Sequence, residues 1–135
     1  MDVLTKEQRR RNMRAIRARD TRPEMFVRRL VHSMGFRYRL HGPGLPGRPD
    51  LVFASRKKVL FVHGCFWHRH RCKYGRVLPA TRREFWSAKL QKNVERDRRV
   101  RYQLRVLGWQ SFIVWECQLK SADDLADRIR VFLLG

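Results

Sequence analysis

The segment "DLVFASRKKVLFVH", residues 50–63, decides the fold. Two runs within it, 50–54 and 58–63, are rich in apolar and β-branched residues, and the polar "SRK" separates them, which predicts two short strands joined by a turn. A third short strand is expected at 36–40, before the turn-rich "HGPGLPGRP", and a buried-looking fourth at 110–117. These four runs predict one small sheet.

Helical patterns surround the predicted strands. One helix is expected over 21–35, N-capped by the threonine that begins it, and a last helix over 121–132. Between them, Thr81 and Glu84 have the spacing of a capping box at the start of a long helix over 81–108. The order α, β, β, β, α, β, α predicts a single α/β domain in which helices flank a small mixed sheet.

The charge of the chain indicates its class of partner. The 135 residues, enough for one domain, include 32 basic and only 12 acidic side chains, for a net charge of +20 and a pI near 11.5. Such an excess disfavours an ordinary enzyme of small neutral molecules and favours a polyanion such as nucleic acid. We therefore divide the chain into a basic, DNA-contacting arm at 1–20, helical over 6–18, and a globular domain at 21–135.

The sequence contains no membrane span or secretory signal. No run reaches the roughly 18 apolar residues that a transmembrane helix needs, and the N-terminus lacks the apolar core of a secretory signal, although an Arg-rich transit peptide stays an alternative. Three cysteines make an odd number for a disulfide scaffold, so metal ligation is the better expectation. We expect a cytoplasmic protein.

The segment "HGCFWHRHRC", residues 63–72, carries the densest chemistry in the chain. Its C-x4-H-x-C pattern, completed by a cysteine at the end of the last strand, matches the donors of a structural zinc site: Cys65, His70, Cys72 and Cys117. The alternative is a set of free, partly buried thiols. If zinc takes His70, two histidines, His63 and His68, remain for catalysis.

On the long helix, two polar residues interrupt an apolar stripe. At about 100° per residue, the stripe comprises Trp86, Leu90, Val94, Val100 and Leu104, and the same stripe contains Asn93 and Asp97. An acid facing the core is costly unless a partner compensates for it. Asp97 could pair with Arg101 one turn on, or Asp97 and Asn93 could meet polar groups from the histidine segment.

A second acid, Asp50, opens an apolar strand directly after a proline. Cleavage of a phosphodiester requires a divalent cation and a base, and carboxylate oxygens suit magnesium. The end of the neighbouring strand near His63 could complete such a site. Phe66 and Trp67, large apolar residues in a polar loop, could pack over the zinc or wedge between base pairs.

Five blocks of sequence together closely resemble the very short patch repair endonucleases, the Vsr family: "NMRAIRARDT", "LPGRPDLVF", "HGCFWH", "PATRREFWSAKLQKNVERDRR" and "LGWQSFIVWEC". The resemblance runs from Asn12 to Cys117. It implies a restriction-endonuclease-like fold of the PD-(D/E)XK type and a magnesium-dependent enzyme that nicks DNA 5' of the thymine in T:G mismatches left by deamination of 5-methylcytosine. It also implies a bacterial, nucleoid-associated monomer, with mismatch-repair proteins such as MutL as expected partners.

The resemblance also assigns roles to individual residues. Asp50 looks like the direct magnesium ligand, joined by the backbone carbonyl of Val62, and His68 matches the general base. His63 and Asp97 match the other active-site pair. Glu24 and Asn93 match the groups that hold metal-bound water. The zinc ligands match the four donors named above. Phe66, Trp67 and Trp86 match the aromatic wedge that is inserted into the DNA beside the mismatch. Met13 on the N-terminal arm matches a residue that enters from the opposite groove.

The sequence departs from the familiar patterns in three places. The acid-x-lysine of restriction-like nucleases is replaced by "FVHG", which leaves no lysine for the water, and Val62 stands where a threonine is expected. Arg69 and Arg71 replace part of a histidine-rich run and add phosphate contacts. Trp86 belongs both to the core stripe and to the wedge, which requires that the start of its helix overhang the core.

Two rival functions fit parts of the same pattern. A zinc-stabilised, non-catalytic DNA-binding module would need the acids only for structure. An HUH-type nickase would use "HRH" with a tyrosine nucleophile, Tyr74 or Tyr102, although the central arginine suits a buried strand motif poorly.

Overall fold

A computed structural model describes residues 20–135, and the predicted contact of Met13 lies outside them. The four strands form one sheet in the order β1-β2-β3-β4. They comprise β1 (Arg39–Leu40), β2 (Leu51–Phe53), β3 (Lys58–His63) and β4 (Gln110–Trp115). The first three are antiparallel neighbours, and β4 lies parallel to β3, so the sheet is mixed as predicted.

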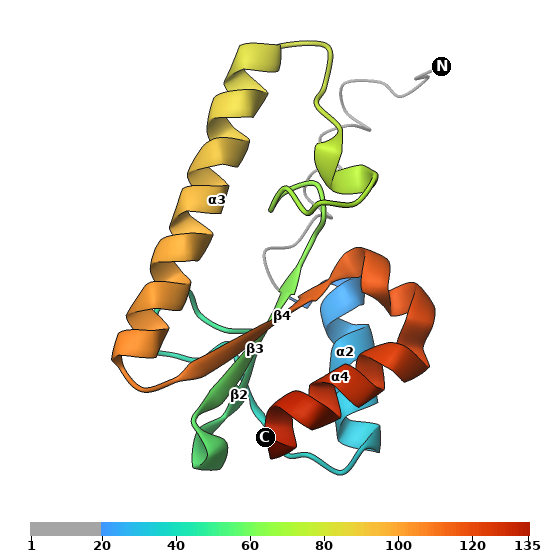
Figure 1. The fold of residues 1–135 in the computed structure, drawn as a ribbon, viewed down its shortest axis with the longest axis vertical. Helices are drawn as coiled ribbons and strands as arrows, with labels where there is room; N and C mark the ends of the chain where they lie inside the picture. Colours follow the sequence, from blue (N-terminus) through green and yellow to red (C-terminus); the bar gives the residue numbers. More distant parts are fainter. Residues whose placement is uncertain (1–19) are drawn as a thin grey trace.

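Within residues 20–135, three α-helices cover the two faces of the sheet (Figure 1). They are α2 (Arg22–Ser33), α3 (Arg83–Val106) and α4 (Ala122–Leu134). Helices α2 and α4 lie on one side of the strands and α3 on the other. No helix in the 20–135 range is long and apolar enough to cross a membrane.

Strand alternation assigns β3 side chains to the two cores. Leu60 belongs to the core beneath α2 and α4, whereas Val59 and Phe61 belong to the core beneath α3. His63 continues the second set by the same alternation and pairs in register with Trp115 of β4. The end of β3 therefore directs a histidine toward α3.

Helix α3 confirms the predicted stripe. The seven residues named from its periodicity, two polar and five apolar, are the seven in α3 that are not fully exposed. The N-terminal part of α3 extends past the sheet, beside the loop that follows β3 (Figure 1). That overhang reconciles the two expectations for Trp86, because its ring packs against Phe66 and Trp67 and not against the sheet.

The start of α2 agrees with the sequence prediction. Thr21 is its N-cap and accepts a hydrogen bond from the backbone N–H of Glu24 at 3.4 Å. Gly35, with φ of 89°, follows the helix in the left-handed conformation that glycine favours.

Several predicted boundaries are wrong. The strand expected over 36–40 comprises only Arg39–Leu40. The N-cap of α3 is Arg82, in a left-handed conformation with φ of 54° and no side-chain capping bond, so Thr81 and Glu84 form no capping box. Strand β4 ends at Trp115, because the chain turns there into a 3-10 helix, η3 (Glu116–Ser121). Cys117 therefore lies in η3 rather than at the end of the strand.

Lys58 shows how the sheet secures the last helix. Its side chain is buried, and Nζ donates to the carbonyls of Phe132 at 2.6 Å and Gly135 at 2.7 Å. Arg56, in the turn η1 (Ala54–Arg56), donates to the carbonyl of Leu133 at 3.1 Å. These cations satisfy carbonyls that a helix C-terminus leaves without partners.

Candidate active site and metal centre

A cavity of about 640 Å³ opens where α2, the loop before β2, the end of β3 and α3 meet. Its walls carry predicted catalytic side chains from α2, the loop before β2, β3, the loop after β3 and α3: Glu24, Asp50, His63, His68 and Asp97. Val62 also lines it, whereas Asn93 is not among the lining residues. The structure thus collects most of the predicted site around one space.

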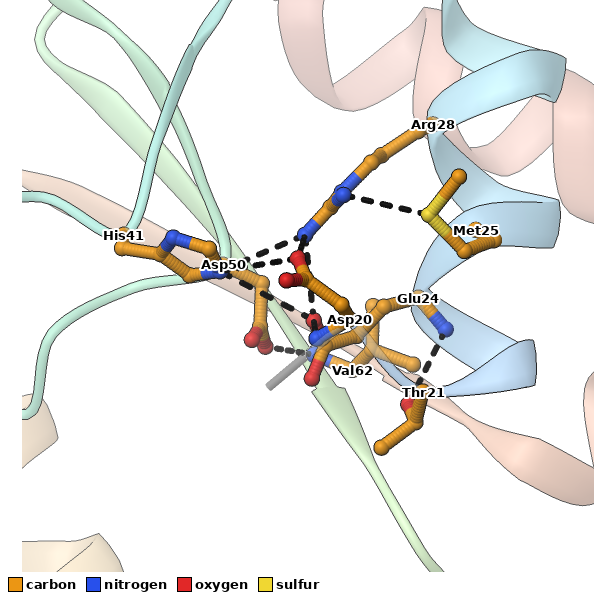
Figure 2. Close-up of polar contacts among 8 residues, drawn as sticks. All are labelled: Asp20, Thr21, Glu24, Met25, Arg28, His41, Asp50 and Val62. Atoms are coloured by element: carbon orange, nitrogen blue, oxygen red, sulfur yellow. Dashed lines mark hydrogen bonds and ion pairs between the residues drawn. The ribbon is translucent and has the colours of Figure 1, made fainter. Parts of the chain in front are cut away.

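Asp50 stands at the mouth of β2, where its carboxylate meets the neighbouring strand. Its Oδ2 accepts a hydrogen bond from the backbone N–H of Val62 at 2.6 Å (Figure 2). Burial raises the pKa of Asp50 to about 7, and the negative charge of Glu24 adds to the rise, while the bond from Val62 opposes it. Such a crowded pair of acids favours a cation between or beside them.

Glu24, in the first turn of α2, is only 4% exposed. Its Oε2 accepts from the backbone N–H of Asp20 at 2.7 Å and lies 3.3 Å from Nη2 of Arg28. The same Nη2 contacts Asp20 Oδ1 at 2.6 Å and His41 Nε2 at 3.2 Å (Figure 2). A buried guanidinium therefore holds the acids at this side of the cavity.

Arg28 and His41 were not foreseen from the sequence. The i, i+4 spacing of Glu24 and Arg28 on one helix was a usable signal for the first. No sequence signal pointed to His41, which reaches the cluster because the turn-rich loop folds back beside α2.

The two free histidines form a compact unit with Asp97. Nδ1 of His68 lies 2.6 Å from Oδ2 of Asp97, and the rings of His63 and His68 stack at 3.7 Å with an interplanar angle of 8°. Asp97 therefore meets the histidine segment, and the alternative pairing with Arg101 is wrong. With Nδ1 held by a carboxylate, Nε2 is the ring nitrogen of His68 that could accept a proton.

His63 is held neutral. It is 7% exposed, and burial lowers its pKa to about 3, with a further contribution from the adjacent His68. Its Nδ1 has no hydrogen-bond partner among the described residues.

Asn93 lies one turn before Asp97 on α3. Its Nδ2 donates a hydrogen bond to the carbonyl of Trp67 at 3.1 Å, and this bond ties the histidine loop to the helix.

The predicted zinc ligands also come together. The donor atoms of Cys65, His70, Cys72 and Cys117 all lie within 4.8 Å of one another. Sγ of Cys117 is 3.4 Å from Nδ1 of His70, and the backbone N–H of Cys117 is 3.4 Å from Sγ of Cys65. Three sulfurs and one imidazole nitrogen are the donor set of a closed tetrahedral zinc site, so these residues fit the metal.

Gly75 makes the zinc loop possible. The glycine is buried in the short turn η2 (Tyr74–Arg76), and a Cβ there would overlap the carbonyl oxygen of His70. Only glycine lets the backbone approach this ligand so closely.

Three aromatic side chains gather beside the overhanging start of α3. The rings of Phe66 and Trp67 lie 5.1 Å apart, and Trp86 is within 5.9 Å of each. Phe85, not foreseen from the sequence, extends the group at 5.5 Å from Trp86, and it is 44% exposed. Nζ of Lys89 lies within 6.0 Å of three of these rings. The predicted wedge residues thus form one cluster.

Trp115 connects the zinc site with the histidines, whereas the sequence pattern placed it only in a strand. Its ring stacks on His70 at 4.3 Å and meets the edge of His63 at 5.3 Å. The alternation and register of β4 were the missed signal, because they place Trp115 beside His63.

Comparisons with known proteins agree with this arrangement. Residues 1–74 match the family model described as DNA mismatch endonuclease Vsr. The chain is 48% identical over 132 residues to "Type II nicking enzyme V.XorIIP" of Xanthomonas oryzae pv. oryzae (strain KACC10331 / KXO85), with 98% of this chain and 96% of that protein covered. It is 49% identical over 126 residues to "DNA mismatch endonuclease Vsr" of Escherichia coli (strain K12), with 93% and 80% covered.

A solved structure shares the fold. The "Homing Endonuclease I-Bth0305I Catalytic Domain" superposes with a TM-score of 0.60 at 21% identity, covering 85% of this chain and 96% of that one. At this identity the likeness concerns the fold alone.

Proposed function

The chain belongs to the Vsr family of DNA mismatch endonucleases and nicking enzymes, and from this premise we propose that it nicks DNA 5' of the thymine in a T:G mismatch with the help of magnesium. The observation that carries the proposal is the cavity in which the pair formed by His68 and Asp97, 2.6 Å apart, shares one space with Asp50. A base beside a carboxylate ligand is the minimum equipment for metal-assisted phosphodiester hydrolysis.

Asp50 would hold the magnesium together with the backbone carbonyl of Val62. The N–H of Val62 already donates to Asp50, and in an extended strand the N–H and C=O of one residue point to the same side. When bound, the cation would neutralise charge that develops on the cleaved phosphate. Glu24, buried and held by Arg28, would orient water from the α2 side of the cavity.

His68 would act as the general base. Asp97 fixes its ring through Nδ1, which leaves Nε2 to take a proton from the attacking water. His63 would support the ring by stacking at 3.7 Å. Asn93 would hold the carbonyl of Trp67 by a hydrogen bond. This bond would fix the loop that carries His68, the proposed base.

Recognition of the mismatch is the finer part of the proposal. The relative from Escherichia coli is named a mismatch endonuclease, whereas the relative from Xanthomonas oryzae is named a type II nicking enzyme. The aromatic cluster of Phe66, Trp67 and Trp86 would insert beside the mismatch, at an unstacking cost of a few kcal/mol per base step. Met13 of the basic arm would enter from the opposite groove.

Double-stranded DNA is the proposed partner of the basic surface, and zinc the proposed structural ion of the Cys3His set. We extend the proposal to a monomer of the bacterial cytoplasm that works with mismatch-repair proteins such as MutL. The named relatives come from bacteria.

The decisive experiment uses an end-labelled duplex with one T:G pair and a matched T:A duplex. Wild-type protein with magnesium should nick the T:G duplex 5' of the thymine, and EDTA or Asp50→Ala should abolish this activity. DNA binding without nicking by the wild type would favour a non-catalytic module. A denaturation-resistant protein–DNA adduct would favour a tyrosine nucleophile, although neither Tyr74 nor Tyr102 lines the cavity.

A further inference from the structure

A second cavity lies behind the histidines. It has a volume of about 400 Å³ and shares His63, His68 and Asp97 with the catalytic cavity, so these three side chains form a common wall. Four arginines line the second cavity: Arg69, Arg71, Arg98 and Arg101. We call it the arginine pocket.

The arginines come from two segments, helix α3 and the loop after β3. Arg98 and Arg101 are three residues apart on α3 and therefore share one face of the helix, beside Asp97. Arg69 and Arg71 flank the zinc ligand His70. Arg69 is further anchored, because its Nη1 donates to the carbonyl of Val77 at 2.7 Å. The charges are thus held around one space by a helix and a metal-ligating loop.

These arginines have no acidic partner in the folded domain. Within residues 20–135, none of the four forms an ion pair with a carboxylate. Among the described residues, the one carboxylate that lines the pocket is Asp97, and it is already bonded to His68. Four cations in a small cavity repel one another, and an anion would relieve that repulsion. The planar guanidinium matches phosphate oxygens in two-point contacts.

We propose that the arginine pocket binds one phosphate group and that, during catalysis, this is a DNA backbone phosphate within a few nucleotides of the cleaved bond. The assignment to DNA rests on the proposed function. Because one wall of side chains separates the two cavities, a strand with its scissile phosphate at Asp50 and His68 passes close to the pocket. Such a contact would set the register of the strand without reading its sequence.

The test compares two double variants with equal loss of charge. Arg98→Gln/Arg101→Gln removes the α3 half of the pocket. Arg99→Gln/Arg105→Gln is the matched control, because both residues are exposed on the same helix and line neither cavity. All four side chains are exposed, so both variants should fold, and their melting curves and zinc content verify this.

Binding is measured without magnesium on duplexes that carry a single neutral methylphosphonate at successive backbone positions. For the wild type and the control, one position near the T:G pair should weaken binding about tenfold, and the pocket variant should be insensitive to it. The slope of log K against log salt should also become shallower by about 1 for each phosphate that the variant no longer neutralises. This assay does not require nicking, so failure of the proposed activity would leave the pocket testable.

A second arm distinguishes a free anion from DNA. Inorganic phosphate, compared with chloride at equal ionic strength, is titrated while the melting temperature is followed. Suppose that phosphate stabilises the wild type and the control but not the pocket variant, and that no methylphosphonate position has a specific effect. The pocket would then bind free phosphate and not DNA. If the pocket variant and the control behave alike in both arms, the pocket binds no phosphate and the proposal is wrong.

Discussion

The proposed zinc site and the proposed catalytic cavity differ in how their side chains are brought together. Three of the four candidate zinc ligands fall within residues 65–72, and Cys117 comes from elsewhere. The cavity, in contrast, takes only His68 from that loop and its other side chains from α2, from the loop before β2, from β3 and from α3. A local cluster is visible in the sequence because its spacing is set by one loop, whereas the cavity exists only after the strands have paired.

The two sites also differ in what they do to stability. Zinc would stabilise the thiolates of its site, so the site would hold the loop in place. At the cavity, Asp50 and buried Glu24 are like charges, and Arg28 offsets only part of their repulsion. We therefore expect zinc-site variants to lose structure and function together, and variants of Asp50 and His68 to lose function without losing stability.

The largest effect is expected from Cys117→Ser. Removal of one of four donors should release zinc, lower the melting temperature by roughly 10 °C or more and abolish nicking. Zinc content and thermal unfolding measure the change. Ser121→Ala, an exposed position in the same 3-10 helix, is the control and should keep its zinc. Normal zinc content in Cys117→Ser would refute the four-ligand assignment.

His68→Ala should separate chemistry from structure. Loss of the general base should slow nicking by roughly 10²- to 10⁴-fold, while zinc content and mismatch affinity stay close to wild type. Single-turnover nicking and equilibrium binding provide the two readouts. His32→Ala changes an exposed histidine of α2 and should leave both unchanged. A comparable loss of affinity in His68→Ala would contradict its role as base.

Asp50→Asn should abolish nicking yet stabilise the protein when no magnesium is added, by roughly 1 to 3 kcal/mol at neutral pH. The pKa of Asp50 is raised to about 7 in the folded state, mainly by burial. The unfolded chain releases the carboxyl proton near pH 4, whereas the folded protein holds it up to about pH 7. The free energy of unfolding of the wild type therefore falls as the pH rises from about 4 to about 7. The advantage of the variant should grow over this range.

Asp97→Asn is the contrasting control, because its carboxylate has a partner in His68 and the substitution should destabilise the protein. A lower melting temperature for Asp50→Asn at neutral pH would contradict the view of Asp50 as a costly, functional charge.

The smallest effect is expected from Trp115→Leu, which tests whether the two sites are coupled. Its contacts with His70 and His63 resemble aromatic pairs of about 0.5–1.5 kcal/mol. We expect single-turnover nicking at saturating DNA to fall up to about tenfold with zinc retained. Trp109→Leu, a half-buried indole near Lys57, should change stability without this selective loss. Equal effects of the two variants on nicking would argue against coupling.

Periodicity predicted much of the fold and part of the site. The stripe on α3 identified every residue that the helix buries or half-buries, including Asp97, because a helix repeats every 3.6 residues regardless of what covers it. The capping box failed because the left-handed backbone of Arg82 redirects the chain just before the helix. Such a conformation depends on the path of the preceding loop, which residue types alone do not specify.

By itself, the sequence determined the donors, the charge and the alternation of strands and helices. The C-x4-H-x-C spacing, the acid at the mouth of β2 and the net charge of +20 are properties of the chain, and they predicted a metal site and a polyanionic partner. Only the tertiary structure decided which groups became neighbours. It placed Asp97 against His68 rather than Arg101, brought His41 to Arg28 and gathered four arginines beside the histidines. These contacts join residues far apart in the chain, so they follow from sheet register and helix packing, which no local spacing encodes.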